Sequence, residues 1–400
     1  MRILLLVVYY PPSTTSAAQM MQDLAQEYVR QGHQVIVATP SDAIEDTLSL
    51  SDEEGVTVVR VRTGNMKHSG KVKRLWRESR LSAVMWRNAT ALFQSNACDL
   101  IVCYSPTIFL GGLVGRLKRL WRCPVYLILR DIFPKWAVDA GLIGRGLLYR
   151  YFKRAELGMY RAADVIGVEA PGTLSYFRDE LGKHHFRVEV LRNWVDTREQ
   201  PASCTCSRQR LGLVDKIIFF YGGNIGVAQD LDNILRLASG MRAQEDVFFL
   251  LIGSGSEVER LKAEIARQEM NNIRILPPLA PKEYLQCLAE SDVGLVSLDR
   301  RLTSHNFPGK LLGYVLCGKP VLASLNPGND LIQFLHQTKA GLACINGDDD
   351  TLRAAALSLA TQPELRQRLG NNARTLGDTT FSVQVIAKQI LASCFTAMIA

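Results

Sequence analysis

Several features that would narrow the class of a protein are absent from this sequence. No apolar run approaches the roughly 20 residues that a helix needs to cross a bilayer. The cysteines number nine, an odd count, and most of them lie inside apolar segments. The pair Cys204 and Cys206 has no second pair at the spacing of a zinc site. These absences predict reduced thiols, as in a cytoplasm, and no structural zinc.

The first residues also lack the marks of a targeting signal. The apolar run at 3–9 is short, and no small-residue cleavage site follows it. We therefore expect a buried first strand here rather than a signal peptide.

What is present suits two domains of the α/β class. The chain has 400 residues, 47% of them hydrophobic, which is enough for two cores. Apolar, strand-like runs alternate with helix-like segments along the whole length, and this order predicts parallel sheets. We place the first domain at 1–197, the second at 198–383 and a last helix at 384–400, with a polar linker at 197–210.

The stretch 293–325 carries the strongest chemical signal. A strand-like run is followed by a basic loop and then by a helix whose first turn holds Pro308, Gly309 and Lys310. Free N–H groups at a helix start favour an anion and Lys310 adds a full charge, so a diphosphate would fit. The same pattern also fits an ordinary crossing from strand to helix with a solvated lysine. The residues that we expect to bind the anion are Arg300, Arg301, His305, Gly309, Lys310 and Leu311.

Two glycine-containing turns follow other strands of the second half. Glycines let the backbone approach a phosphate or sugar without a Cβ clash. No Gly-Lys-Ser/Thr follows the first of them, so it is not a Walker loop, and a plain turn explains it nearly as well. The expected ligand-binding residues here are Gly222, Gly223, Asn224, Gly226 and Gly253.

Polar residues also follow two strands of the first half. Pro12 and Ser13 come after the first strand, and Arg130 and Asp131 come after the strand predicted at 124–129. Open α/β sheets bind ligands at the carboxyl ends of their strands. Asp131 is therefore a candidate general base, and the alternatives are a pair with Arg130 or a helix cap.

Taken in order, these segments resemble the retaining glycosyltransferases of the family 4 type, in the branch that builds bacterial polysaccharides. The likeness lies in Gly-Lys-Pro-Val at 318–321, Gly-Asn-Ile-Gly at 223–226 and Asp-Ile-Phe-Pro at 131–134. It covers nearly the whole chain and implies the GT-B fold, two Rossmann-like domains with parallel sheets facing a cleft. In that family the first domain binds the acceptor, the second binds the nucleotide sugar, and the last helix returns to the first domain.

The resemblance also implies roles for residues. Lys310 would hold the diphosphate of a UDP-sugar, and Asp131 would act near the acceptor, beside Pro12, Ser13 and Arg130. No cofactor and no metal ion are expected, because the protein supplies the positive charge.

The chain departs from the family pattern in three places. The two glutamates of the family motif correspond here to His305 and Gly313, so the contact to the ribose is open. A Lys-Gly pair of the broader family reads Gln229-Asp230 here, and Arg300 or Arg301 would have to replace its charge.

Basic residues concentrate in one segment. The net charge is +8, and eight Lys or Arg against a single acid lie between Arg62 and Arg87. The spacing predicts a basic, tryptophan-containing amphipathic helix at 71–92, which suits an anionic membrane surface. A helix packed on its domain with a solvated basic face is the alternative, and no nucleic-acid motif accompanies the charge. The expected membrane contacts are Trp76, Arg77, Arg80 and Trp86.

We therefore predict a glycosyltransferase at the cytoplasmic face of the plasma membrane. The resemblance implies a UDP-sugar donor, with an N-acetylated aminosugar such as N-acetylfucosamine, and a polyprenyl-diphosphate-linked saccharide acceptor in O-antigen, lipopolysaccharide or capsule assembly. The alternatives are a hydrolysing nucleotide-sugar epimerase of the same fold and a catalytically silent assembly partner at the membrane. No nucleic acid partner is expected.

Overall fold

The computed structural model describes residues 1–13, 15–64, 71–139, 141–198, 206–302 and 307–396, apart from the side chains of 71–74 and 396. The chain divides into two compact units. The first unit comprises Met1–Arg192 together with the chain from Val383 onward, and the second comprises Asn193–Ser382. Each unit is described below by itself.

The first unit is built on a sheet with the strand order β3-β4-β2-β1-β5-β6-β7-β8. All neighbouring strands are parallel except β3 and β4, which form an antiparallel pair. The central strand β1 carries four aliphatic residues, 3–6, that are fully buried, as expected for a strand covered on both faces. The strands are β1 (Arg2–Leu6), β2 (Gln34–Ser41), β3 (Leu48–Glu53), β4 (Val56–Arg62), β5 (Leu100–Ser105), β6 (Val125–Leu129), β7 (Val165–Val168) and β8 (Val188–Val190).

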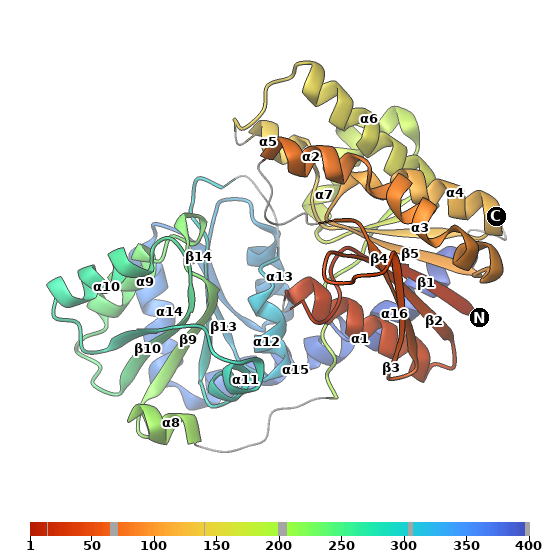
Figure 1. The fold of residues 1–400 in the computed structure, drawn as a ribbon. Helices are drawn as coiled ribbons and strands as arrows, with labels where there is room; N and C mark the ends of the chain where they lie inside the picture. Colours follow the sequence, from red (N-terminus) through yellow and green to blue (C-terminus); the bar gives the residue numbers. More distant parts are fainter. Residues whose placement is uncertain (14, 65–70, 140, 199–205, 303–306, 397–400) are drawn as a thin grey trace. The chain divides into compact units, whose positions relative to one another are not determined.

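Helices cover both faces of this sheet. On one face α3, α4 and α6 pack against one another, and on the other α1 packs against α16 (Figure 1). Residues of α3, α4, α6 and α7 join the apolar strand residues in one continuous core. The helices are α1 (Ser16–Arg30), α2 (Lys71–Ser79), α3 (Leu81–Ser95), η1 (Ile108–Leu110), α4 (Gly111–Trp121), α5 (Lys135–Asp139), α6 (Leu147–Ala162), α7 (Pro171–Asp179), η2 (Gly182–His184) and α16 (Val383–Thr396).

Helix α16 follows the second unit in the chain but belongs to the first. Its apolar side chains Ile386 and Ile390 are buried, and it packs against α1 and β6. The Gln389 side chain donates to the carbonyl oxygen of Val190 at 2.9 Å, and Ser393 donates to Glu189 at 2.7 Å. Both apolar packing and hydrogen bonds therefore fix this helix to the first sheet.

The second unit has a parallel sheet with the order β11-β10-β9-β12-β13-β14. Its strands are β9 (Ile217–Asn224), β10 (Val247–Ser254), β11 (Ile273–Leu276), β12 (Val293–Ser297), β13 (Val321–Leu325) and β14 (Gly341–Ile345). Its helices are α8 (Cys206–Leu211), η3 (Val227–Gln229), α9 (Asp232–Gly240), α10 (Val258–Arg267), α11 (Pro281–Ala289), α12 (Lys310–Leu316), α13 (Asp330–Thr338), α14 (Asp349–Thr361) and α15 (Pro363–Thr379). The predicted two-domain α/β fold with parallel sheets is confirmed.

Some elements differ from the prediction. The basic helix expected at 71–92 is two helices, α2 and α3, because Arg80 ends the first and caps the second. The expected linker includes α8, so it is partly helical. The second unit begins earlier than the expected boundary after 197, because Val195 forms a bridge with Ser382 and donates to the carbonyl of Phe381 at 2.8 Å.

The replacement Gly253→Ala tests the close approach of β9 and β10. A Cβ at position 253 would lie 1.8 Å from the carbonyl oxygen of Gly223, so the two strands would have to separate locally. We expect the free energy of unfolding to fall by about 1–3 kcal/mol, as for other overpacked sites. Urea unfolding followed by circular dichroism measures the change.

Gly158→Ala in α6 is the matched control for this experiment. Apart from the backbone of α6 itself, no atom of the described residues would lie within 4 Å of a Cβ at position 158, and alanine is the better helix former. The control should leave stability unchanged or raise it by up to ~1 kcal/mol. Equal losses in both variants would contradict the packing argument.

Candidate functional site

Each sheet has a topological switch point, where the strands stop being added on one side of a central strand and continue on its other side. In the first unit β1 lies between β2 and β5, and in the second β9 lies between β10 and β12. Loops leave such a point in opposite directions, and open α/β sheets bind ligands beside the carboxyl ends of the strands there. The ends of β1 and β5, and those of β9 and β12, are therefore the places to look for a site.

At the end of β9, glycines form part of the strand. Gly222, Gly223 and Asn224 pair with β10, so the prediction of a loop starting at Gly222 was wrong. Gly223 has φ of +123°, a conformation that suits glycine. The backbone of Gly223 lies against Gly253, one of the predicted contacts, so these residues do lie together.

The turn after β9 is held by Gln229, one of the residues at which the sequence departs from the family pattern. The Gln229 oxygen accepts from the Asn224 side chain at 2.7 Å and from the Gly226 N–H at 3.2 Å. Gln229 therefore fixes the turn. Asn224 stays exposed at the edge of the sheet.

Lys310 begins helix α12, next to the end of β9. Its Nζ lies 4.7 Å from the centre of the Tyr221 ring, and Tyr221 directly precedes Gly222 in the strand. The side chain is half-buried, and this burial lowers the pKa of Lys310 from its usual 10.5 to about 8. No carboxylate of the described residues forms a salt bridge with it. The site therefore holds a positively charged ammonium group that no acidic side chain of the described residues neutralises, so it can attract an anionic ligand.

The other predicted residues of this segment are placed differently. Gly309 is the exposed residue before α12, which begins at Lys310 rather than at Pro308. The Leu311 side chain is 2% exposed and faces the core, so only its backbone could reach a ligand. His305 lies outside the described residues. A Cβ at Gly313 would lie 2.8 Å from Leu288, so α12 packs closely on α11 at the position of the family's glutamate.

The two arginines after β12 also differ from each other. Arg301 binds the carboxylate of Asp299 through several hydrogen bonds, including two from its Nε at 3.0 Å. This arginine lowers the pKa of the Asp299 carboxyl. Arg301 is thus engaged in an ion pair, whereas the exposed Arg300 lies near Gly347. Of the two, Arg300 is the better placed to meet a ligand.

Buried asparagines, which the sequence analysis missed, hold these loops. The Asn346 side chain donates to Asp230 at 2.9 Å and to the carbonyl of Leu298 at 2.8 Å. Asn326 donates to the carbonyl of Leu302 at 3.0 Å. These bonds tie the loop after β12 to β13 and β14. Asn326 and Asn346 each directly follow an apolar strand, and this position in the sequence could have indicated their role.

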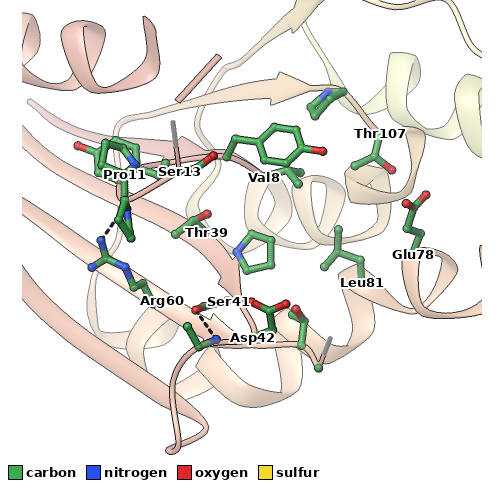
Figure 2. A pocket seen from close by; sticks show the side chains of 18 residues that line it. Val8, Pro11, Ser13, Thr39, Ser41, Asp42, Arg60, Glu78, Leu81 and Thr107 are labelled. Carbon is green, nitrogen blue, oxygen red and sulfur yellow. Dashed lines mark hydrogen bonds between the residues drawn. The ribbon is translucent and has the colours of Figure 1, made fainter. Parts of the chain in front are cut away.

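The first unit contains a pocket of about 460 Å³ at its own reversal point (Figure 2). This volume lies within the range of small-molecule sites. Tyrosines, prolines and Leu81 supply apolar wall, and hydroxyls with the carboxylates of Asp42 and Glu78 supply polar groups. The predicted residues Pro12 and Ser13 line it. Its lining comes from the ends of β1, β2, β4 and β5 and from α2 and α3: Val8, Tyr9, Tyr10, Pro11, Pro12, Ser13, Thr39, Pro40, Ser41, Asp42, Ala43, Arg60, Thr63, Gly64, Glu78, Leu81, Pro106 and Thr107.

Arg60 fixes one wall of this pocket. Its Nη2 donates to the carbonyl oxygen of Pro11 at 2.7 Å, as Figure 2 shows, and its Nη1 donates to Glu53 at 2.6 Å. The arginine lowers the pKa of the Glu53 carboxyl through this hydrogen bond. The strand β4 thus anchors the loop that contains Pro11, a link that no local sequence pattern indicated.

Arg130 and Asp131 follow β6 and do not line this pocket. Arg130 donates to the carbonyl of Arg192 at 3.3 Å, and Arg192 donates to the carbonyl of Glu169 at 3.1 Å. Asp131 is an exposed residue, but neighbouring protein keeps part of the water away from its carboxyl. This desolvation raises the pKa of the carboxyl, although the positive charge of Arg130 acts to lower it. Glu169 is 8% exposed, and burial raises its pKa to about 7. The sequence analysis missed this second carboxyl near Asp131.

Two features are absent from the described part of the chain. No group of three or more His, Cys, Asp or Glu there is placed to hold a metal ion. Asp230 and Asp232 are one residue apart, but Asp232 pairs with Arg260 at 2.6 Å while Asp230 accepts from Asn346. Among those same residues no helix combines the length and the apolar character that crossing a membrane requires.

Comparison with known families defines the class of protein. Residues 15–194 match the family described as "Glycosyl transferase 4-like domain", and residues 206–376 match "Glycosyl transferases group 1". The two matches fall on the two units of the fold and together cover most of the chain. The chain therefore belongs to the two-domain glycosyltransferases with the GT-B fold.

Individual relatives are distant. The chain is 25% identical to the probable glycosyltransferase WbjE of Pseudomonas aeruginosa over 228 residues, 56% of each protein, so this match spans little more than half of that relative. It is 24% identical to the putative colanic acid biosynthesis glycosyl transferase WcaI of Escherichia coli (strain K12) over 304 residues, 73% of each protein.

Solved structures share the fold over the full length. Anabaena HepE, solved in complex with UDP, has a TM-score of 0.68 at 17% identity, covering 99% of this chain and 100% of that one. Sucrose-phosphate synthase from Thermosynechococcus elongatus has a TM-score of 0.71 at 16% identity, covering 100% and 99%. At these identities the likeness establishes the fold.

Lys310→Met should stabilise the second unit at neutral pH. The lysine is charged below pH 8 in the folded unit, where burial disfavours the charge, and methionine removes this cost. We expect a gain of about 1–3 kcal/mol at pH 7. The gain should shrink between pH 8 and 10.5, because the folded wild type loses its buried charge over that range and the unfolded chain does not.

Urea unfolding at pH 7 and pH 10 measures this difference. Lys262→Met is the control, since that side chain is 48% exposed and its replacement should change little. A wild type that is more stable than Lys310→Met at pH 7 would contradict the buried charge.

Proposed function

We propose that this protein transfers a sugar from a UDP-sugar to a lipid-linked saccharide during assembly of a bacterial surface polysaccharide. The observation that carries the proposal is the half-buried Lys310 ammonium beside the end of β9, without a carboxylate partner among the described residues. The names of WbjE and WcaI and the UDP complex of HepE support the same class of reaction.

The second unit would hold the donor. A diphosphate placed at the ends of β9 and β12 would meet Lys310, the exposed backbone at Gly223 and the exposed Arg300. Partial burial makes the charged form of Lys310 unfavourable in the free protein, because the ammonium group has lost hydration. A bound anion would replace that hydration and so stabilise the charge. Lys310 would then stabilise the negative charge that develops on the leaving UDP. This protein charge serves in place of a metal ion in the proposed reaction.

The first unit would hold the acceptor. Its pocket combines aromatic and proline walls with hydroxyl and carboxylate groups, which suits a saccharide that offers both hydroxyls and apolar ring faces. Arg60 is already paired with Glu53, so this pocket is poorer in available positive charge than the site at Lys310. Asp131 follows β6 and does not line this pocket, so we assign it the role of base for an acceptor hydroxyl that projects beyond the pocket toward the end of β6. Its raised pKa improves it as a proton acceptor.

The donor sugar in this proposal is an N-acetylated aminosugar, and the anomeric configuration is retained. The acceptor is a polyprenyl-diphosphate-linked saccharide of an O-antigen or capsule. Such a substrate requires work at a membrane, and the exposed Trp76 with Arg77 and Arg80 offers a surface for anionic lipid. Trp86 does not belong to that surface: it is half-buried, packs against the core and stacks on Phe93 at 6.3 Å.

Lys310→Ala should weaken binding of UDP. Loss of a charged contact to the diphosphate should lower the affinity about 10- to 100-fold at pH 7. The wild type should bind more weakly at pH 9 than at pH 7, because Lys310 loses its proton around pH 8, while the variant should show little of this change. Titration calorimetry measures both effects, with Lys262→Ala as the control. Equal affinity of wild type and Lys310→Ala would refute this donor site.

Asp131→Asn should slow transfer without affecting UDP affinity. Removal of a general base costs roughly 100- to 10,000-fold in rate. The assay measures UDP released from a panel of UDP-sugars, with and without a lipid-linked saccharide. The control is Asp139→Asn, which removes a carboxylate paired with Lys135 in α5.

The same assay separates the proposed transferase from other proteins of this fold. Release that requires the acceptor supports transfer. Equal release without acceptor would indicate a hydrolysing enzyme, and the absence of nucleotide binding would indicate a protein without this activity.

A further inference from the structure

Exposed apolar side chains gather on one part of the first unit that the sequence analysis did not single out. Leu147 is 83% exposed and Leu142 is 67% exposed, values far from those of a packed leucine. Leu142 lies between α5 and α6, and Leu147 is the first residue of α6. Trp136, Leu148 and Tyr151 in the same segment are also exposed. A concentration of large exposed apolar residues usually marks a surface that contacts a partner.

One of these residues, Tyr151, lies against a small core that is separate from the main one. Ile108, Phe109 and Phe152 form a buried cluster that is separate from the main core. The Tyr151 ring lies 6.1 Å from Phe109. This contact with the buried cluster holds the exposed Tyr151 ring in place.

A second aromatic contact extends the same arrangement to α5. The Trp136 ring lies 6.0 Å from Phe133, and Phe133 lies 4.8 Å from Phe152. The exposed rings of Trp136 and Tyr151 are therefore the outer layer of one cluster.

Helix α2 adds a third element to this surface. Its Leu75 packs against the same cluster, and the next residue, Trp76, is 58% exposed. Figure 1 shows α2, α5 and α6 together on the first unit. The Arg80 guanidinium lies 4.7 Å from the Trp76 ring. We call Trp76, Trp136, Leu142, Leu147, Leu148 and Tyr151 the apolar patch.

The apolar patch is surrounded by positive charge. Residues 135–154 contain five Lys or Arg and one acid, Asp139, which pairs with Lys135 at 2.7 Å. Arg145, Arg150 and Arg154 are exposed, and within the described ranges none of them forms a salt bridge. These charges would favour an anionic surface over a neutral one.

We propose that the apolar patch docks on a bilayer that contains anionic phospholipid. The leucines and aromatic rings enter the boundary between headgroups and acyl chains, and the arginines meet the lipid phosphates. Tryptophan and tyrosine suit this depth, because their rings are apolar and their N–H and O–H groups can stay hydrated. The inference rests on the proposed function for its purpose, which is to bring the enzyme to a lipid-linked acceptor.

Sedimentation with lipid vesicles tests the docking surface. Vesicles of phosphatidylcholine with phosphatidylglycerol should bind the full-length wild type, and vesicles of phosphatidylcholine alone should bind it at least tenfold more weakly. The double variant Leu147→Glu, Leu148→Glu should lose at least tenfold in partition to the anionic vesicles. Both changes fall in the first turn of α6, where a carboxylate suits the helix dipole, so the fold should persist.

Two controls keep this test clear. Leu50→Glu changes a leucine of β3 that is 56% exposed outside the apolar patch, and it should bind vesicles like the wild type. Trp136→Ser is a second patch variant, and it should also weaken binding while the melting temperature stays unchanged.

The outcomes separate this inference from the assignment of the donor. Wild-type binding to anionic vesicles in the absence of any UDP binding would support the docking surface and count against the transferase. Vesicle binding that is unchanged in both patch variants would overturn the docking surface, and so would a wild type that binds no vesicles. A dimer that the double variant dissociates, without vesicle binding, would assign the patch to a second copy of the chain.

Discussion

The burial of one ammonium group without a described acidic partner is the constraint around which the second unit is arranged. Lys310 lies over the Tyr221 ring at the start of α12, where burial shifts its pKa toward the physiological range. A lysine in that position lowers the stability of the free unit, whereas an apolar residue would not. The close packing of β9 on β10 at Gly253 and the Asn346 hydrogen bonds hold the surrounding loops in place. The unit therefore maintains a partly buried positive charge, which an anionic ligand would stabilise.

The two units use the same architectural solution for different chemistry. In both, the chain reverses its direction of growth beside a central strand, and the site lies at the strand ends there. In the second unit this position presents a lysine and bare backbone. In the first it presents a pocket of hydroxyl, carboxylate and aromatic groups whose arginine is already neutralised by Glu53. The difference in charge follows from side chains on a shared backbone plan, and it is the basis on which we propose a diphosphate for the second unit and a saccharide for the first.

The sequence predicted the fold well because alternation of apolar strands and helices is a local property. It also indicated the loops after β1, β9 and β12, since glycine, proline and lysine stand out directly after apolar runs. It could not predict the pair of Arg60 with Glu53 and Pro11, or that Arg301 is occupied by Asp299, because such contacts depend on the folded positions of side chains. Trp86 was misplaced for the same reason: helical spacing did not reveal that its ring packs against Phe93. The exposure of Leu147 likewise depends on how the neighbouring helices pack, which the local sequence does not reveal.

Helix α16 imposes an order on the biogenesis of the protein. Its buried residues Ile386 and Ile390 complete the packing of the first unit, yet the ribosome synthesises them after the whole of the second unit. Domains generally fold as they emerge, from the N-terminus onward. Here the nascent first unit must wait with an uncovered face beside α1 while the second is translated. The first unit thus lacks part of its apolar packing until α16 has been synthesised.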